Sequence, residues 1–283
     1  AITEFVERVK PWLIDRAAGG EPLTFFEVVT LLGLWYFDRQ NVDIAVLEIG
    51  LGGEYDATSV VDPVASCVTN ISLEHTSVLG DTIKEIATTK AAVAPDDAPL
   101  VTGATGEALS TLKTEAGAVL TVGTDGDGGH DDSANGDDST DGTDDDGGHD
   151  DSADGNDMRD GDADTADRDD TATRKTAVTV SYDGRVTRTA AEIGVSIPSA
   201  GESQATLPST FADGLALDAR LPLLGEHQAI NAGIATTLAG QVVDSLNGDD
   251  EGESVVTLDD DTLRCGLRNA HWPGRFEVMG ESP

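Results

Sequence analysis

Hydrophobic positions near the start of the chain recur at helical intervals. In the first stretch they lie three or four residues apart, at Phe5, Val9, Trp12 and Leu13. This spacing predicts a helix over residues 4–16. A second helix is predicted over residues 24–39, because Thr24 followed three residues later by Glu27 matches a capping box at a helix start.

Farther along, short apolar runs alternate with helical stretches. Strands are predicted over residues 42–49, 65–71, 100–102 and 118–122, and helices over residues 82–93 and 107–115. The first of these runs is rich in β-branched residues and ends in Gly50-Leu51-Gly52-Gly53, which is typical of a strand buried on both faces of a parallel sheet. The alternation predicts an α/β fold with a doubly wound, mostly parallel sheet.

A small β-rich part and a long helix are predicted for the last third of the chain. The hydrophobic pattern gives a hairpin over residues 177–189 that turns at Asp183-Gly184, a strand over 215–221, and a helix over about 225–246. Between the two parts lies an Asp- and Gly-rich tract, residues 124–175. Such a segment has too few apolar residues to offset the entropy of ordering, so we expect a disordered insertion.

The charge balance points to a salt-adapted protein. The chain has 54 acidic and 17 basic residues, for a net charge of −37, and the excess acidity extends beyond the tract. In ordinary salt this charge would strain a compact fold and repel nucleic acid and anionic membranes, so neither is expected as a partner. Molar salt shortens the Debye length to about 3 Å and removes most of that repulsion. The alternative, an acidic tail for a basic partner, explains the tract alone.

Other features of the composition favour a cytoplasmic protein. No apolar run approaches the roughly eighteen residues of a membrane span. Cys67 and Cys265 lack a metal-ligand spacing and are expected to be inert thiols in a reducing compartment. The first residue is Ala1, without an initiator Met or a signal peptide, which suggests that the sequence begins inside a longer chain.

Two polar residues at strand ends suggest a ligand site. Glu48 and His75 lie at or just beyond the carboxyl ends of two predicted strands, which is where ligands gather in open α/β sheets. A carboxylate and an imidazole could meet there across neighbouring strands. The alternative is that Glu48 caps a helix and His75 is a surface residue.

Six motifs in order along the chain resemble the signatures of folylpolyglutamate and dihydrofolate synthases, a family of the Mur ligase superfamily. They are Thr24-x-Phe26-Glu27, the segment from Leu47 through Gly50-Leu51-Gly52-Gly53 to Asp56-Ala57-Thr58, Ser72-Leu73-Glu74-His75-Thr76, Ile86-Ala87-x-x-Lys90-Ala91, Leu224-Gly225-x-His227-Gln228-x-x-Asn231-Ala232, and Trp272-Pro273-Gly274-Arg275-x-Glu277. The resemblance covers residues 24–277 apart from the acidic tract.

The resemblance implies an ATP-dependent ligase that joins L-glutamate to the carboxylate of folate or dihydropteroate through an acyl phosphate. Glu48 and His75 would bind Mg2+, with His75 also catalytic. Lys90 would be a catalytic lysine that reacts with carbon dioxide to form a carbamate and so becomes a further metal ligand. ATP would be bound by Asn231 and Arg275. The pterin-binding residues would be Thr24, Tyr55, Asp56 and Ala57.

Several positions depart from the family pattern. Ser59 replaces an Asn, Glu74 an Asp and Tyr55 a Leu. Two changes flank Lys90, where Thr89 replaces a Glu and Ala92 a Gly. The sequence also lacks the phosphate-binding motif GxxxxGK[ST], which the family places before the position of residue 1.

The resemblance also implies a domain plan and leaves alternatives open. Residues 1–123 and 176–270 would form the central ATPase domain around the insertion at 124–175, and residues 271–283 would begin a C-terminal domain. We expect a monomer with small-molecule substrates, in a polypeptide that could be fused to dihydropteroate synthase. The alternatives are another Mur-type amino-acid ligase and a catalytically inactive binding module.

Overall fold

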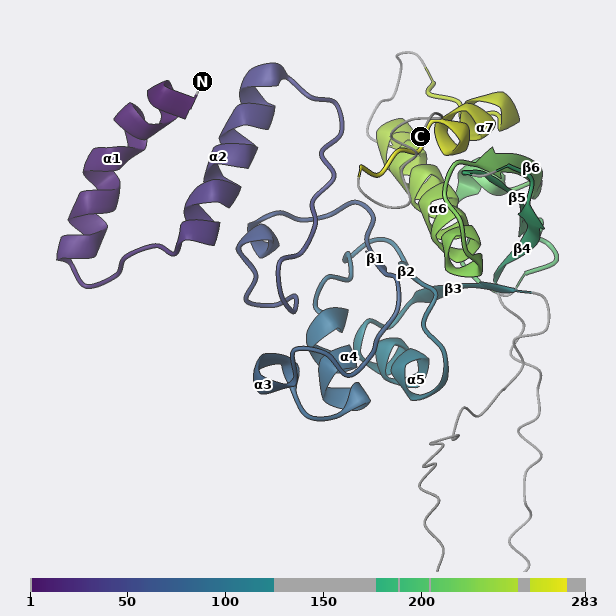
Figure 1. The fold of residues 1–283 in the computed structure, drawn as a ribbon, viewed down its shortest axis with the longest axis horizontal. Helices are drawn as coiled ribbons and strands as arrows, with labels where there is room; N and C mark the ends of the chain where they lie inside the picture. The colour runs from purple at the N-terminus through teal and green to yellow at the C-terminus, as the bar shows by residue number, and fades with distance from the viewer. Residues whose placement is uncertain (1, 125–176, 188, 204, 249–254, 274–283) are drawn as a thin grey trace, which may run out of the picture. The chain divides into compact units, whose positions relative to one another are not determined.

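The computed structural model describes residues 2–124, 177–187, 189–203, 205–248 and 255–273 (Figure 1). The predicted insertion therefore lies outside the described residues except for Thr124. The fold is mixed α/β, as the alternating pattern predicted.

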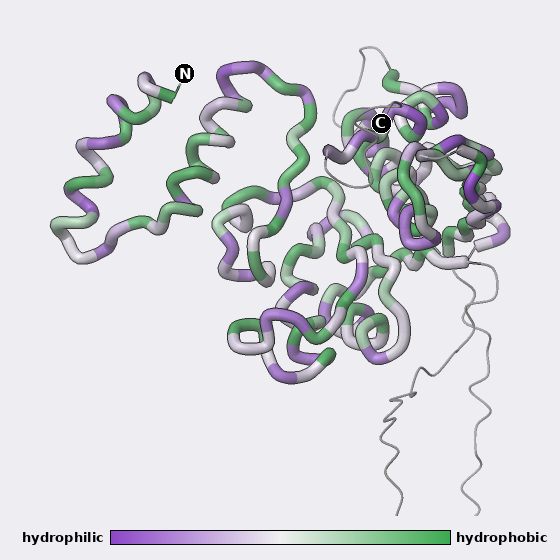
Figure 2. The backbone as a smooth tube through the Cα atoms, viewed as in Figure 1, coloured by the Kyte–Doolittle hydropathy of each residue, from purple (hydrophilic) through white to green (hydrophobic). Residues whose placement is uncertain are grey.

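Two helices begin the chain, α1 (Ile2–Ala18) and α2 (Phe25–Gln40), as the spacing of apolar positions predicted (Figure 2). The capping box is formed, because the Thr24 hydroxyl accepts the Glu27 N–H at 3.2 Å while the Glu27 carboxylate accepts the Thr24 N–H at 2.6 Å. The rings of Phe5 and Trp35 lie 5.5 Å apart and join the two helices.

A six-stranded sheet runs in the order β1-β2-β3-β4-β5-β6. Its strands are β1 (Cys67–Val68), β2 (Leu100–Thr102), β3 (Val119–Thr124), β4 (Val178–Arg185), β5 (Ala191–Ile197) and β6 (Leu215–Leu221). Neighbouring strands from β1 to β4 pair in parallel, whereas β5 is antiparallel to both β4 and β6. The structure thus confirms a parallel part joined to a smaller β-rich part.

Helices cover both faces of the parallel part. In β2, Leu100 packs in a cluster with residues of α4 (Ile83–Ala91) and α5 (Gly106–Glu115), whereas Val101 packs in a cluster with residues of α6 (Glu226–Gly248). Both side chains are fully buried. Successive residues of a strand point to opposite faces, so this strand is enclosed on both sides.

The antiparallel part buries one face. Alternate residues of β5 are buried and face α6 and α7 (Asp260–Arg268), and the residues between them are more exposed. Three short helices complete the described elements: η1 (Ala57–Val60), α3 (Thr76–Leu79) and η2 (Ser209–Phe211). No helix in the described part of the chain is long and apolar enough to cross a membrane.

The strand predicted over residues 42–49 is wrong. This segment is extended but belongs to no strand, and Val46 is 88% exposed. An apolar, β-branched run becomes a strand only where a neighbouring backbone takes its hydrogen bonds, and the described residues provide no such neighbour here. The adjacent prediction over 65–71 was too long, because only Cys67 and Val68 pair with β2.

The predicted hairpin turn is misplaced. Asp183 and Gly184 lie inside β4, where the register shifts between Tyr182 and Gly184 in the manner of a β-bulge. The partner strand is β5 at residues 191–197, not the predicted residues 186–189. The alternating burial of β5 against the core determines this register.

Candidate active site

The glycine-rich loop at residues 50–53 folds around one carboxylate. Asp56 is 7% exposed. Its Oδ2 accepts the backbone N–H groups of Gly50 and Leu51, each at 3.0 Å. Its Oδ1 accepts the N–H of Thr58 at 2.9 Å and the Thr58 hydroxyl at 2.7 Å, which caps η1. One side chain therefore ties the loop to the short helix that follows it.

These hydrogen bonds keep Asp56 ionised. Burial alone would raise the pKa of Asp56, but the hydrogen bonds from Thr58, Leu51 and Gly50 outweigh it and hold the pKa below its ordinary value. The carboxylate is thus a permanent acceptor at neutral pH.

The loop passes close to two helices at positions where only glycine fits. A Cβ on Gly50 would lie 2.8 Å from the ring of Phe26 in α2, and a Cβ on Gly53 would lie 2.7 Å from the carbonyl oxygen of Thr89 in α4. The loop therefore packs against both helices, and its contact with α4 is adjacent in sequence to Lys90.

The residues predicted to bind a pterin lie on and beside this loop. Tyr55 is 88% exposed, and Ala57 begins η1. Thr24 precedes α2, the helix whose Phe26 contacts the loop. The Thr24 hydroxyl is engaged in the capping box, where it donates to the Glu27 carboxylate at 2.7 Å. The predicted pterin contacts thus gather at one loop, although Asp56 faces inward.

Lys90 is paired with a carboxylate. Its Nζ lies 3.6 Å from Oε1 of Glu74, and its side chain is 24% exposed. A carbamate would join carbon dioxide to the same nitrogen that this ion pair engages. The predicted carbamate therefore stays a prediction that requires this ion pair to open.

His75 follows Glu74 and has an unusual backbone. Its φ is 52°, in the left-handed region, at the residue before α3. Non-glycine residues in this conformation are uncommon and gather at functional sites. The structure thus brings Lys90 next to the segment that carries His75.

Glu48 lies on the exposed segment before the loop. Its charge, added to the larger effect of burial, raises the pKa of the Cys67 thiol in β1. The described residues contain no group of three or more His, Cys, Asp or Glu side chains placed to hold a metal. Glu48 and His75 are both exposed, and the Glu48 carboxylate is the oxygen ligand that magnesium usually takes, whereas the His75 imidazole is a softer ligand.

The predicted ATP contact Asn231 belongs to a hydrogen-bonded row at the start of α6. Asn231 Nδ2 donates to Gln228 Oε1 at 3.2 Å, and Gln228 Nε2 lies 3.1 Å from His227 Nε2. Because an amide nitrogen can only donate, His227 Nε2 must accept, and the row fixes the orientation of the Asn231 amide. Arg275, the other predicted ATP contact, lies outside the described residues.

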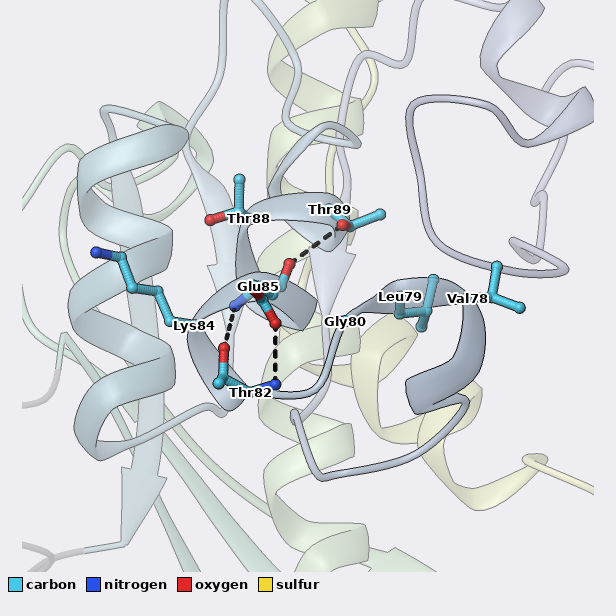
Figure 3. Close-up of a pocket in the computed structure, with 8 residues that line it drawn as sticks. All are labelled: Val78, Leu79, Gly80, Thr82, Lys84, Glu85, Thr88 and Thr89. Carbon is cyan, nitrogen blue, oxygen red and sulfur yellow. Dashed lines mark hydrogen bonds between the residues drawn. The ribbon is translucent and has the colours of Figure 1, made fainter.

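A hollow of about 600 Å³ beside α4 does not contain any predicted site residue (Figure 3). Its acidic side chain, Glu85, accepts the N–H groups of Asp81 and Thr82 at 2.8 and 3.2 Å and so caps α4. The lining residues are Val78, Leu79, Gly80, Thr82, Lys84, Glu85, Thr88 and Thr89. The hollow therefore lies at the start of α4 and adjoins the glycine-rich loop through Thr89, whose carbonyl oxygen lies close to Gly53.

Two contributors were missed by reasoning from the sequence, Thr58 and Gln228. Thr58 is buried and supplies two of the four hydrogen bonds to Asp56. Gln228 is a buried polar residue on the first turn of α6. The available signals were an Asp followed two residues later by Thr, a common local turn, and a polar residue on the buried side of a helix.

Two curated proteins match the whole chain. A probable bifunctional folylpolyglutamate synthase/dihydropteroate synthase of Haloferax volcanii is 50% identical over all of this chain. The protein of the same description from Halobacterium salinarum is 42% identical, again over all of it. The chain spans 25% and 26% of the lengths of these relatives.

A solved structure has the same fold. An FPGS–AMPPCP–folate complex superposes with a TM-score of 0.65 at 23% identity, and the match covers 99% of this chain and 52% of that one. No protein-family model matches the chain. Over its whole length, the chain is therefore similar to a segment of proteins described as probable bifunctional folylpolyglutamate synthase/dihydropteroate synthases.

Proposed function

We propose that the protein containing this chain is an ATP-dependent ligase that adds L-glutamate to the carboxylate of folate or dihydropteroate. The observation that carries the proposal is the packing of the glycine-rich loop against Thr89, next to Lys90. This contact supports a pterin site at the loop, next to the lysine that we propose to be catalytic. The similarity to proteins described as folylpolyglutamate synthases supports the same substrates.

The reaction would proceed by activation of the substrate carboxylate. ATP transfers its γ-phosphoryl group to the carboxylate, which gives an acyl phosphate and ADP. The amine of L-glutamate then attacks the acyl carbon, phosphate leaves, and an amide bond forms. The folate and AMPPCP bound in the solved complex support a site for both molecules on this fold.

Residues of this chain would position the reactants. Tyr55, Ala57 and Thr24 would line the pterin site, and Asn231 and Arg275 would hold ATP. Glu48 and His75 would hold magnesium, with Lys90 as a further ligand if carbamylated. Magnesium, when bound, would supply a Lewis acid beside the phosphates.

The net charge supports a salt-rich environment for the protein, and the relatives support a fusion to a second enzyme. The net charge of −37 supports a salt-rich cytoplasm, where short-range screening removes the repulsion within the fold. Fusion to dihydropteroate synthase is supported by the descriptions of the two relatives. Residues 1–123 and 176–270 would form the central ATPase domain, with 124–175 inserted and 271–283 leading into the next domain. We propose that the protein is a monomer.

The substrate class can be tested with the full-length protein in high salt. ADP release should require dihydropteroate or folate together with ATP and L-glutamate, and mass spectrometry should detect the glutamylated product. A UDP-linked muramyl substrate serves as the control for another Mur-type ligase. ADP release that depends on the muramyl substrate and not on the pterin would overturn the proposal.

A further inference from the structure

Asp56 has no acceptor capacity left for a substrate. An ionised carboxylate offers about four lone-pair sites on its two oxygens. In this structure four donors occupy them, namely the N–H groups of Gly50, Leu51 and Thr58 and the Thr58 hydroxyl, all within 3.0 Å. A pterin could bind this carboxylate only by displacing a donor that belongs to the loop itself.

We propose that Asp56 is a positioning residue that locks the loop at residues 50–53 to η1, and that it does not itself contact the pterin. This assignment rests on the proposed function for the identity of the ligand. The lock between Asp56 and the loop is a property of the substrate-free chain.

Asp56 is the acceptor for two successive backbone N–H groups of the loop. Within the described residues, the segment 42–53 belongs to no strand. The N–H groups of Gly50 and Leu51 both point at Asp56 Oδ2. Leaving such donors without an acceptor is costly, and hydrogen bonds to a charged group are stronger than those between neutral groups.

The loop held by Asp56 has little room to move. Gly53 passes the Thr89 carbonyl at a distance that excludes a Cβ, and a Cβ on Gly50 would have to displace the Phe26 ring. A loop that drifts from this position would change the placement of the exposed Tyr55 relative to α4 and Lys90. Asp56 therefore holds the loop, and with it Tyr55, in position relative to Lys90 on α4.

The substitution Asp56→Asn tests the lock without changing side-chain size. An amide has one oxygen, so its NH2 group must face N–H donors either at Gly50 and Leu51 or at Thr58. In the full-length, substrate-free protein, hydrogen exchange followed by mass spectrometry should show faster exchange, by about tenfold or more, either at residues 50–51 or at Thr58, whichever side the NH2 group faces. The matched control is Glu54→Gln, which removes an exposed carboxylate from the same loop and should leave exchange unchanged.

Kinetics then separate positioning from contact. With Asp56→Asn the KM for the pterin substrate should rise severalfold, while the KM values for ATP and L-glutamate stay the same. Thr58→Val should shift the pterin KM in the same direction, and the double variant should show less than the product of the two effects. Glu54→Gln should leave all three KM values unchanged.

Two results would overturn the inference. One is normal exchange both at residues 50–51 and at Thr58 in Asp56→Asn. The other is a raised pterin KM in Asp56→Asn together with a normal pterin KM in Thr58→Val, which would indicate direct contact. Since the exchange measurement uses no substrate, its failure is distinct from failure of the proposed ligase activity.

Discussion

Two side chains in the candidate site already interact with neighbouring groups of the chain. Asp56 is satisfied by its own loop, and Lys90 is paired with Glu74. The sequence motifs identified both Asp56 and Lys90 as candidate site residues. Which partner each side chain contacts depends on tertiary folding, because spacing along the chain does not reveal that a carboxylate turns inward or that an ammonium meets the glutamate before His75.

Asp56 gives the protein a specific pH dependence. Its pKa is lowered in the folded state, so its stabilising contribution is complete above the ordinary value of 3.8 and is lost as pH falls through the lower folded value. We expect wild type to unfold at a higher temperature than Asp56→Asn near neutral pH, by an amount that corresponds to about 1–3 kcal/mol. Thermal unfolding between pH 7 and pH 2 should show the two proteins converge in acid. A difference that persists at the lowest pH would contradict this explanation.

The ion pair of Lys90 predicts how this lysine responds to its partner. Glu74→Gln removes the carboxylate 3.6 Å from Lys90 and so releases the lysine nitrogen from its ion pair. If the proposed carbamate exists, its occupancy should increase in this variant when bicarbonate is supplied. A 13C carbamate signal after labelling with 13C-bicarbonate measures it, with Lys90→Arg as the control that cannot form one. Equal or weaker signal in Glu74→Gln would contradict the prediction.

Secondary-structure elements were predictable where local and tertiary signals agree. The capped helices α2 and α4, the buried strand β2 and the long helix α6 all follow the sequence pattern. Residues 42–49 have a strand pattern without a strand partner, and Gly184 marks a bulge that resembles a turn in sequence. The helix α7 was missed because it has only two buried apolar residues, Leu263 and Leu267, one turn apart.

The face of α5 that packs against the sheet can be tested by substitution. Leu112 is fully buried in the cluster that also contains Leu100. Leu112→Ala should lower the free energy of unfolding by about 2–5 kcal/mol, because it removes apolar contacts and leaves a cavity. The adjacent residue Lys113 is exposed and provides the control, since Lys113→Ala should change the free energy of unfolding by less than about 0.5 kcal/mol. Denaturant unfolding measures both, and similar effects from the two changes would contradict the assigned face of α5.

The acidity of the whole chain predicts a dependence on salt. Acidic residues outnumber basic ones both inside and outside the tract at 124–175. Screening of this repulsion should raise the melting temperature as potassium chloride increases toward molar concentration. A variant without the tract should show the same direction of change and keep activity within a few-fold in high salt. A flat or falling melting temperature would contradict salt adaptation of the folded part.

We propose that Glu48 and His75 bind the magnesium of a glutamate ligase. The most direct measurement is steady-state ADP release by the full-length enzyme with dihydropteroate, ATP and L-glutamate across a magnesium titration. Glu48→Gln keeps the shape of the side chain but removes its charge, so turnover should fall at least about a hundredfold, or about 2.7 kcal/mol. His75→Ala should lose less and be partly rescued by excess magnesium, because water can replace a neutral ligand. Near-normal turnover of Glu48→Gln at low magnesium would contradict the account.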